Sequence, residues 1–143
     1  MSRRMMVVLF VLGTVLLGAA GSRAGEAGNP LESLPPVVVR TMPVQGAVGV
    51  DPGLKEIRVT FSRRMSRRSW SWVSVDPDAW PPVTGRPRFV DGGRTCVLPV
   101  SLEPGREYAV LVNSDRYRGF RDRAGRPAVP FLLRFRTAKA KGR

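Results

Sequence analysis

Short apolar runs separated by turn-forming residues characterise the chain from residue 37 to residue 137. In the segment 56–61, Ile57, Val59 and Phe61 alternate with polar residues, which is the pattern of a half-buried β-strand. Clusters of Gly, Pro, Asp and Asn recur roughly every ten residues, a spacing typical of all-β sandwiches and barrels. No stretch keeps the 3.6-residue period of an amphipathic helix for long. The pattern therefore predicts an all-β domain.

Six further segments are expected to be strands, namely residues 37–39, 69–72, 88–90, 94–100, 107–113 and 131–136. The Asp91-Gly92-Gly93 turn between two of them predicts a β-hairpin. About seven strands in roughly a hundred residues are typical of an Ig-like antiparallel β-sandwich. In such a fold the alternating Ile, Trp, Leu, Tyr and Phe side chains would fill the space between two stacked sheets.

The N-terminal residues have the character of a targeting segment. Two arginines precede an apolar run over residues 5–20, and the small residues of Gly21-Ser22-Arg23-Ala24 follow it. This is the order of a secretory signal peptide, and the apolar run is shorter than the roughly 20 residues of a spanning helix. We expect a signal-peptide helix over residues 1–24, with an uncleaved membrane anchor as the alternative. Residues 25–36 then form a linker, and residues 138–143 a basic tail.

The composition narrows the chemistry of the domain. The formal net charge is +13, from 24 basic and 11 acidic residues, and 21 of the basic residues are Arg. Such a charge attracts polyanions, although the codon bias of a GC-rich genome produces the same excess of Arg without any ligand. The chain has no His and a single cysteine, Cys96. Histidine-based catalysis, an intrachain disulfide and a cysteine-histidine zinc site are therefore excluded, and no metal or cofactor is expected.

The stretch FSRRMSRRSWSW, residues 61–72, combines Arg and Trp as polyanion sites do. Its arginines are Arg63, Arg64, Arg67 and Arg68. One hypothesis makes them a ligand-binding cluster. The other makes the stretch a strand junction, in which Phe61 ends a strand, Met65 fills a gap beneath the turn, and Trp70 or Trp72 enters the core. We favour the junction.

A second basic cluster comes before the last strand and consists of Arg116, Arg118, Arg121, Arg123 and Arg126. It would join the first cluster in one positive end of the molecule if both loops lay at the same pole, which the sequence leaves open. The alternative is a solvated loop with Phe120 tucked inward. Trp80 lies in a Pro-rich loop, where it either stacks on a sugar or anchors an interface, or else caps an open end of the sandwich.

The segment Leu102-Glu103-Pro104-Gly105-Arg106-Glu107-Tyr108 predicts a tyrosine corner. In Greek-key sandwiches such a tyrosine bonds through its hydroxyl to the backbone a few residues upstream. We therefore assign Tyr108 a structural role, and likewise Phe135 on the inward face of the last strand. Asp122 and Gly125 are better explained by a capped turn than by a fragment of a calcium loop.

These motifs, taken in order, resemble the bacterial Ig-like domain of the SbsA type over about residues 36–137. The segments that carry the resemblance are residues 43–50, 57–62 with Met65, 91–95, 102–105 with Tyr108, 122–127 and 135–137. The chain departs from the family at Arg126, where the family often has Asn. The resemblance implies a seven-strand sandwich with a non-enzymatic role in surface architecture, adhesion or spacing, and no catalytic residues.

We therefore expect a non-enzymatic exported module, periplasmic, cell-surface or secreted, with a structural, adhesive or protein- or carbohydrate-binding role at the cell envelope. The alternative is a polyanion-binding module that holds an acidic polysaccharide or a nucleic acid with its arginine loops. The expected partner is an envelope protein or an acidic polysaccharide, with no nucleic acid in the cell and a membrane only if the signal is uncleaved. The carboxylate pairs Asp76–Asp78 and Asp115–Asp122 are nominal glycosidase candidates, but their sequence surroundings do not suggest burial.

Overall fold

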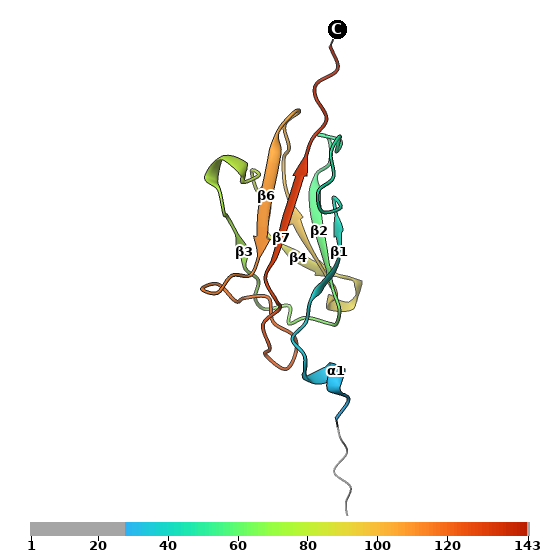
Figure 1. The fold of residues 1–143 in the computed structure, drawn as a ribbon, viewed down its shortest axis with the longest axis vertical. Coiled ribbons are helices and arrows are strands. Elements are labelled where there is room, and N and C mark those ends of the chain that lie inside the picture. Colours follow the sequence, from blue (N-terminus) through green and yellow to red (C-terminus); the bar gives the residue numbers. More distant parts are fainter. Residues whose placement is uncertain (1–27, 143) are drawn as a thin grey trace, which may run out of the picture.

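Two antiparallel β-sheets form the body of the protein in a computed structural model that describes residues 28–142 (Figure 1). One sheet has the strand order β1-β2-β5-β4 and the other the order β3-β6-β7. The strands are β1 (Val38–Met42), β2 (Glu56–Phe61), β3 (Trp72–Val73), β4 (Arg88–Val90), β5 (Thr95–Pro99), β6 (Glu107–Val112) and β7 (Phe131–Arg136). The predicted all-β sandwich of about seven strands is confirmed. The predicted signal peptide lies outside the described residues.

The β4–β5 hairpin is present as predicted, and a short 3-10 turn, η2 (Asp91–Gly93), connects its strands. Gly92 and Gly93 have φ angles of 67° and 94°, which glycine adopts without the steric cost that a Cβ brings. Any Cβ at position 93 would also lie 3.3 Å from the carbonyl oxygen of Met65. The turn is therefore packed directly against the connection that follows β2.

The third strand is shorter than expected, because only Trp72 and Val73 pair with β6. Trp70 precedes the strand and does not share its ladder. The residues before Trp72 are held by the side chains of two serines and by one backbone bond, from the N–H of Asn113 to the carbonyl of Ser71. The hydroxyl of Ser69 donates to the carbonyl of Gly119, and the N–H of Gly119 donates to the hydroxyl of Ser71. The alternation of Ser and Trp indicated extended backbone over residues 69–72. It could not indicate that Ser69 and Ser71 would bond to Gly119 in the loop between β6 and β7.

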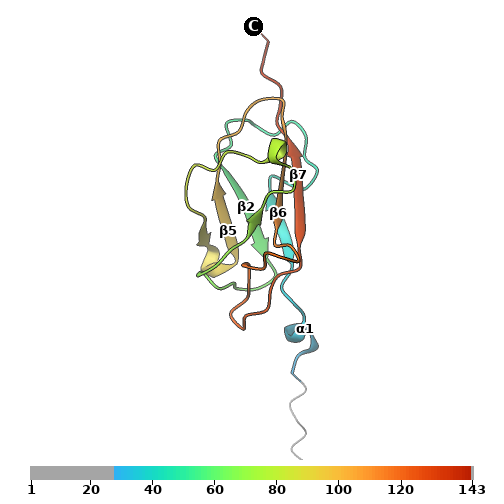
Figure 2. The same ribbon diagram turned by 90° about the vertical axis from the view of Figure 1, so that its left-hand side faces the viewer.

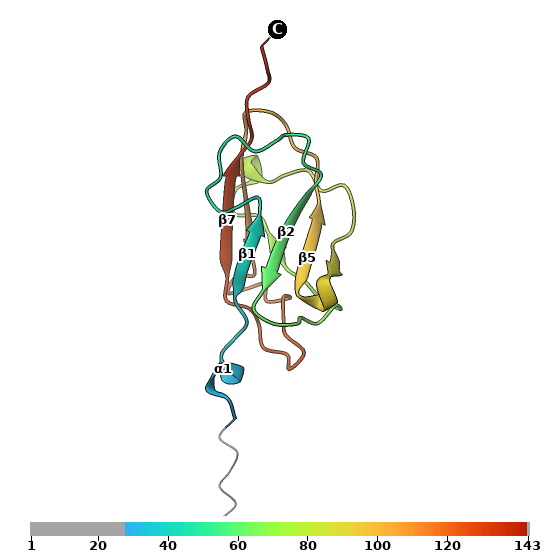
Figure 3. The same ribbon diagram turned by 90° about the vertical axis from the view of Figure 1, so that its right-hand side faces the viewer.

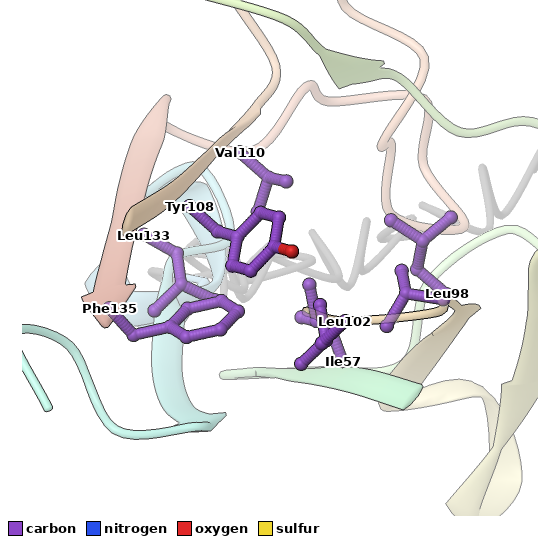
Figure 4. Packing of buried hydrophobic residues seen from close by; sticks show 8 residues of the cluster. Ile57, Leu98, Leu102, Tyr108, Val110, Leu133 and Phe135 are labelled. Atoms are coloured by element: carbon purple, nitrogen blue, oxygen red, sulfur yellow. The ribbon is translucent and has the colours of Figure 1, made fainter. Parts of the chain in front are cut away.

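The core lies between the sheets in two clusters of buried side chains. The first contains Ile57, Leu98, Val100, Leu102, Tyr108, Val110, Leu133 and Phe135. Figure 4 shows its aromatic and branched residues from β6 and β7 facing those from β2 and β5. The second contains Val59, Phe61, Met65, Cys96, Val112, Phe120 and Ala128. The alternating residues of β2 and β6 thus point inward, as their pattern predicted.

Strand β5 departs from this alternation, because Val97 on its outer face is also fully buried. Arg58 on β2 and Arg88 on β4 lie opposite Val97 on either side. Both arginines pair with Glu56, at 2.7 and 2.9 Å. Their aliphatic stems flank an apolar residue while their charged ends meet over one carboxylate. A central strand can therefore be buried on both faces without a third layer.

The tyrosine corner predicted at Tyr108 is present. The backbone N–H of Glu103 donates to the Tyr108 hydroxyl at 2.8 Å, while the ring packs against Phe135 with centroids 5.6 Å apart. The carbonyl of Glu103 in turn accepts from the hydroxyl of Thr137. These bonds join the turn before β6 to the end of β7, at the end of the molecule that carries the C-terminal tail (Figure 3).

The opposite end carries the one-turn helix α1 (Pro30–Ser33), within the segment that the sequence assigned to a linker. Asn29 caps this turn by accepting from the N–H of Leu31. Pro36 is buried, and its carbonyl accepts from the N–H of Val129. The residues just before β1 are thus attached to the body of the domain. Among residues 28–142, no helix has the length and apolar character needed to cross a bilayer.

Candidate binding site: an arginine-rich end and an aromatic groove

The two arginine-rich loops lie at the same end of the sandwich, next to α1 (Figure 1). Met65 in the β2–β3 connection forms a bridge with Asp122 in the β6–β7 loop, and the N–H of Ser66 donates to the carbonyl of Arg121 at 2.8 Å. The structure therefore answers the question that the sequence left open. We call this surface the arginine end and define it as Arg64, Arg67, Arg68, Arg116, Arg118, Arg121 and Arg123.

Asp122 joins the two loops and is almost fully buried. Its Oδ1 accepts from the backbone N–H groups of Ala124 and Arg126, at 3.0 and 2.9 Å. Its Oδ2 accepts from the guanidinium groups of Arg63 and Arg126, each at 3.2 Å. Burial opposes ionisation of this carboxyl, but the hydrogen bonds and charge of Arg126, the N–H of Ala124 and the guanidinium of Arg63 outweigh it, so the pKa of Asp122 lies below its ordinary value.

Arg63 and Arg126 are therefore engaged inside the protein. Besides Asp122, Arg63 donates to the carbonyls of Leu31 and Glu32, and Arg126 donates to the carbonyl of Glu32. The two side chains attach α1 to the loops. The sequence grouped Arg63 with the candidate ligand-binding arginines, whereas its contacts are those of an internal clamp. Arg126, where the family often has Asn, belongs to the same clamp.

Most arginines outside the two loops differ from those of the arginine end, because five of the eight described ones form ion pairs. Five arginines that lie on or beside the strands each form an ion pair with a glutamate within 4 Å, namely Arg58, Arg88, Arg106, Arg134 and Arg136. Within residues 28–142, no carboxylate forms an ion pair with any of the seven arginines of the arginine end. Outside the two loops, Arg40, Arg86 and Arg94 are the described arginines without an ion pair, so seven of the ten unpaired arginines lie where the two loops meet.

The β6–β7 loop is held in shape by Asn113. Its side-chain N–H groups donate to the carbonyls of Phe120 and Ala128, and its Oδ1 accepts from the N–H of Phe120. Phe120 is fully buried and meets Trp72 edge to face, with centroids 5.4 Å apart. The inward position expected for Phe120 in the solvated-loop alternative is therefore found. Sequence reasoning missed Asn113, whose only signal was an Asn at the end of an apolar strand.

A groove of about 600 Å³ lies beside β3, the edge strand of the three-stranded sheet, and is also lined by residues of the connection that leads to β4. Figure 2 shows the backbone from the side on which β3 lies in Figure 1. Four aromatic side chains from three segments line the groove, namely Trp70, Trp72, Trp80 and Tyr117. Val83 and Pro87, in the connection between η1 (Pro77–Ala79) and β4, also line it. We call it the aromatic groove.

The tryptophans have intermediate positions, neither fully buried nor fully exposed. Trp72 packs against both core clusters and Trp70 against the second one, so the core role expected of one of them is partly shared by both. Trp80 packs against the first cluster, in keeping with a structural role, and its ring also lines the groove; its binding of a sugar or a partner stays a prediction. The Nε1 of Trp72 is buried without a hydrogen-bond partner among the described residues, and the Cys96 sulfur that it faces is a weak acceptor.

Two arginines lie against the aromatic rings of the groove. The guanidinium carbon of Arg86 lies 5.1 Å from the centroid of Trp70, and that of Arg116 lies 5.5 Å from the centroid of Tyr117. Both distances are within the range of cation–π contacts. The described residues that line the groove include no Asp or Glu. The groove is therefore aromatic in its wall and cationic at its margin. The sequence gave no sign that Arg86 would meet a tryptophan.

The family of the protein is shown by comparison with known domain families. The profile described as a bacterial Ig-like domain matches residues 32–137. The chain belongs to this family. The resemblance noted from the sequence motifs is thus confirmed.

Two solved structures with a similar arrangement are S-layer proteins. One is the crystal structure of the S-layer protein rSbsC(31–844), with a TM-score of 0.48, and the other covers domains 1–6 of the surface layer protein SbsC, with a TM-score of 0.45. Both are 17% identical to this chain and cover 78% of it, whereas the chain covers only 15% of each of them. No curated protein matches the chain.

The carboxylates of the nominal glycosidase pairs have structural contacts or lie exposed in this Ig-like domain. Asp76 caps η1 by accepting from the N–H of Asp78, and Asp122 is saturated by the clamp described above. Asp115 is exposed. In the part of the chain that the structure describes, no three Cys, Asp or Glu side chains come together in a group able to hold a metal ion.

Proposed function

We propose that this Ig-like domain is an exported, non-enzymatic module of the bacterial cell envelope that binds an anionic polymer at its arginine end. The family membership supports a module without catalytic residues, and the N-terminal sequence pattern supports export. The two-sheet body would hold the loops rigidly, because the clamp around Asp122 and the bonds of Asn113 fix them to buried strands. Rigid loops lose little conformational entropy when a partner binds.

The observation that carries this proposal is the uneven pairing of the arginines. A compositional excess of Arg would place unpaired charges over the whole surface. Instead, five of the eight described arginines outside the two loops form ion pairs with glutamates, whereas seven of the nine loop arginines gather at one end without an ion pair among the described residues. Only Arg63 and Arg126 of the loops pair, both with Asp122. Such a local positive field attracts a polyanion, and the bound counterions that the polymer releases add to the affinity.

The proposal is tested by a salt titration of binding to heparin. The triple variant Arg64→Ser, Arg67→Ser, Arg68→Ser removes three charges from the arginine end and leaves the clamp intact. The control variant Lys55→Ser, Lys139→Ser, Lys141→Ser removes the same charge from exposed positions outside the arginine end. If local charge binds the polymer, the arginine variant lowers the slope of log K against log salt by about two, from roughly 0.7 per lost contact. The lysine variant should leave the slope nearly unchanged.

Equal effects of the two triple variants would mean that heparin responds only to net charge, which contradicts a site at the arginine end. Heparin binding that is undetectable at physiological salt would also contradict the proposal. The domain would then serve only as a structural spacer or as an adhesive module for a protein partner.

A further inference from the structure

We infer that the aromatic groove binds a sugar ring of an acidic polysaccharide, whose anionic groups meet Arg86 and Arg116 at its margin. The inference rests on the proposed function and names its ligand class. It concerns a site that adjoins the arginine end and shares Arg116 with it, but whose wall lies beside β3. Its first support is the aromatic wall formed by Trp70, Trp80 and Tyr117.

The aromatic residues of the groove are only partly used by the core. The residue Tyr117 is 52% exposed, and the tryptophans keep part of their surface open to solvent. A concave, mostly apolar site of about 600 Å³ with a few polar groups falls within the usual size of ligand pockets. Flat aromatic surfaces offer a stacking platform to another flat, weakly polar ring. One face of a hexose ring presents C–H groups, and this weakly polar face can stack on an aromatic ring in the same way.

The positive charge at the margin of the groove favours an acidic sugar over a neutral one. Arg86 and Arg116 are held against aromatic rings, and none of the described lining residues carries a carboxylate. Arg forms paired, directional hydrogen bonds with carboxylate and phosphate groups. A neutral sugar would leave both guanidinium groups without a ligand partner, whereas an acidic one would engage the aromatic wall and the margin together.

The groove and the arginine end are connected through one loop. Tyr117 lines the groove, and its neighbours in sequence, Arg116 and Arg118, belong to the arginine end. This loop is fixed beside Trp70 at Gly119, where a Cβ atom would lie only 2.4 Å from the Trp70 carbonyl oxygen. One polymer chain could therefore lie with a sugar in the groove and its next charged groups at the arginine end.

A single-stranded nucleic acid would also combine stacking with phosphate contacts. The observations favour the polysaccharide for two reasons. The groove is lined by Ser71 and Ser74, whose hydroxyls can donate to and accept from the hydroxyls of a sugar, whereas a single strand is held by stacking and phosphate contacts without such groups. The export that the proposed function assumes also places the groove among envelope polymers. Nucleic acid is therefore an outcome of the test.

The test measures the affinity of full-length protein for an oligogalacturonate by calorimetry and by tryptophan fluorescence. Its comparison probes are a neutral galactose oligomer of equal length and oligo(dT). Val83→Glu places a carboxylate in the wall at an exposed position, and Val48→Glu adds the same charge at an exposed site away from the groove. Tyr117→Ala removes one stacking ring, while Tyr117→Phe keeps it. Thermal melting confirms that each variant is folded.

We expect Val83→Glu and Tyr117→Ala each to weaken oligogalacturonate binding about tenfold or more, and Val48→Glu and Tyr117→Phe to change it little. Unchanged affinity in the two groove variants, with heparin binding at the arginine end intact, would overturn this inference and leave the proposed function standing. Equal binding of the neutral oligomer, or equal and equally sensitive binding of oligo(dT), would also overturn it. If the natural protein bound neither heparin nor oligogalacturonate, both proposals would be overturned together.

Discussion

The replacement Asp122→Asn removes the one charge that joins three segments of the chain. The asparagine keeps an oxygen that can accept from the N–H groups of Ala124 and Arg126. Its amide nitrogen would replace the oxygen that now accepts from Arg63 and Arg126. The guanidinium groups of Arg63 and Arg126 would then face an N–H donor in place of an acceptor. The variant therefore loses the clamp between α1, the β2–β3 connection and the β6–β7 loop with almost no change in volume.

The expected cost follows from the contacts. A hydrogen bond to a charged group contributes about 1.5–3 kcal/mol, and two such bonds are lost. The side chains of Arg63 and Arg126 are 26% and 37% exposed, so hydrogen bonds to water would replace part of the lost free energy. We expect a loss of about 2–3 kcal/mol in the free energy of unfolding. For a domain of this size that corresponds to a fall in Tm of about 8–12 °C.

The assay is urea unfolding followed by tryptophan fluorescence, with Glu103→Gln as the matched control. Glu103 pairs with Arg106 at 2.9 Å, but both side chains are about half exposed. An exposed pair contributes well under about 1 kcal/mol. The control variant should therefore lose less than about 0.5 kcal/mol, although it also changes one carboxylate to an amide.

The pH dependence gives a second readout. Because the pKa of Asp122 is lower in the folded protein than in the unfolded chain, its contribution is complete above the ordinary aspartate pKa of about 3.9 and is lost as the pH falls through the folded value. The difference in stability between the natural protein and Asp122→Asn should thus be constant near neutral pH and shrink under strongly acidic conditions. A loss no larger than that of Glu103→Gln, or a difference that does not narrow in acid, would refute the clamp.

Two further predictions concern the core. Burial raises the pKa of Cys96 to about 12, so a thiol reagent at pH 8 should label it only after denaturation; rapid labelling of the folded protein would show that the β5 core is open. Tyr108→Phe leaves the N–H of Glu103 without its acceptor and should lower the free energy of unfolding by about 1 kcal/mol in urea titration, while no change would mean that water replaces the hydroxyl.

Much of the fold could be read from local patterns. The period-two alternation in β2 and β6 placed Ile57 and Tyr108 inside, because a strand with one buried face must bury every second residue. The Pro-Gly turn before Tyr108 indicated the corner, and Asp91-Gly92-Gly93 indicated the hairpin. These features depend on residues close in sequence, so the sequence is sufficient to reveal them. The same holds for the excess of arginine and for the absence of histidine.

What the sequence could not decide depends on contacts between distant segments. Arg63 and Asp122 are 59 positions apart, and only the packing of two loops against one end of the sandwich makes one the partner of the other. Arg86 and Trp70 meet only because the connection before β4 crosses beside β3. Charge and aromaticity are properties of single residues and can be counted in a sequence. Whether an arginine is neutralised or an aromatic ring stays exposed depends on the residue that lies next to it. Only the tertiary structure determines which residues become neighbours.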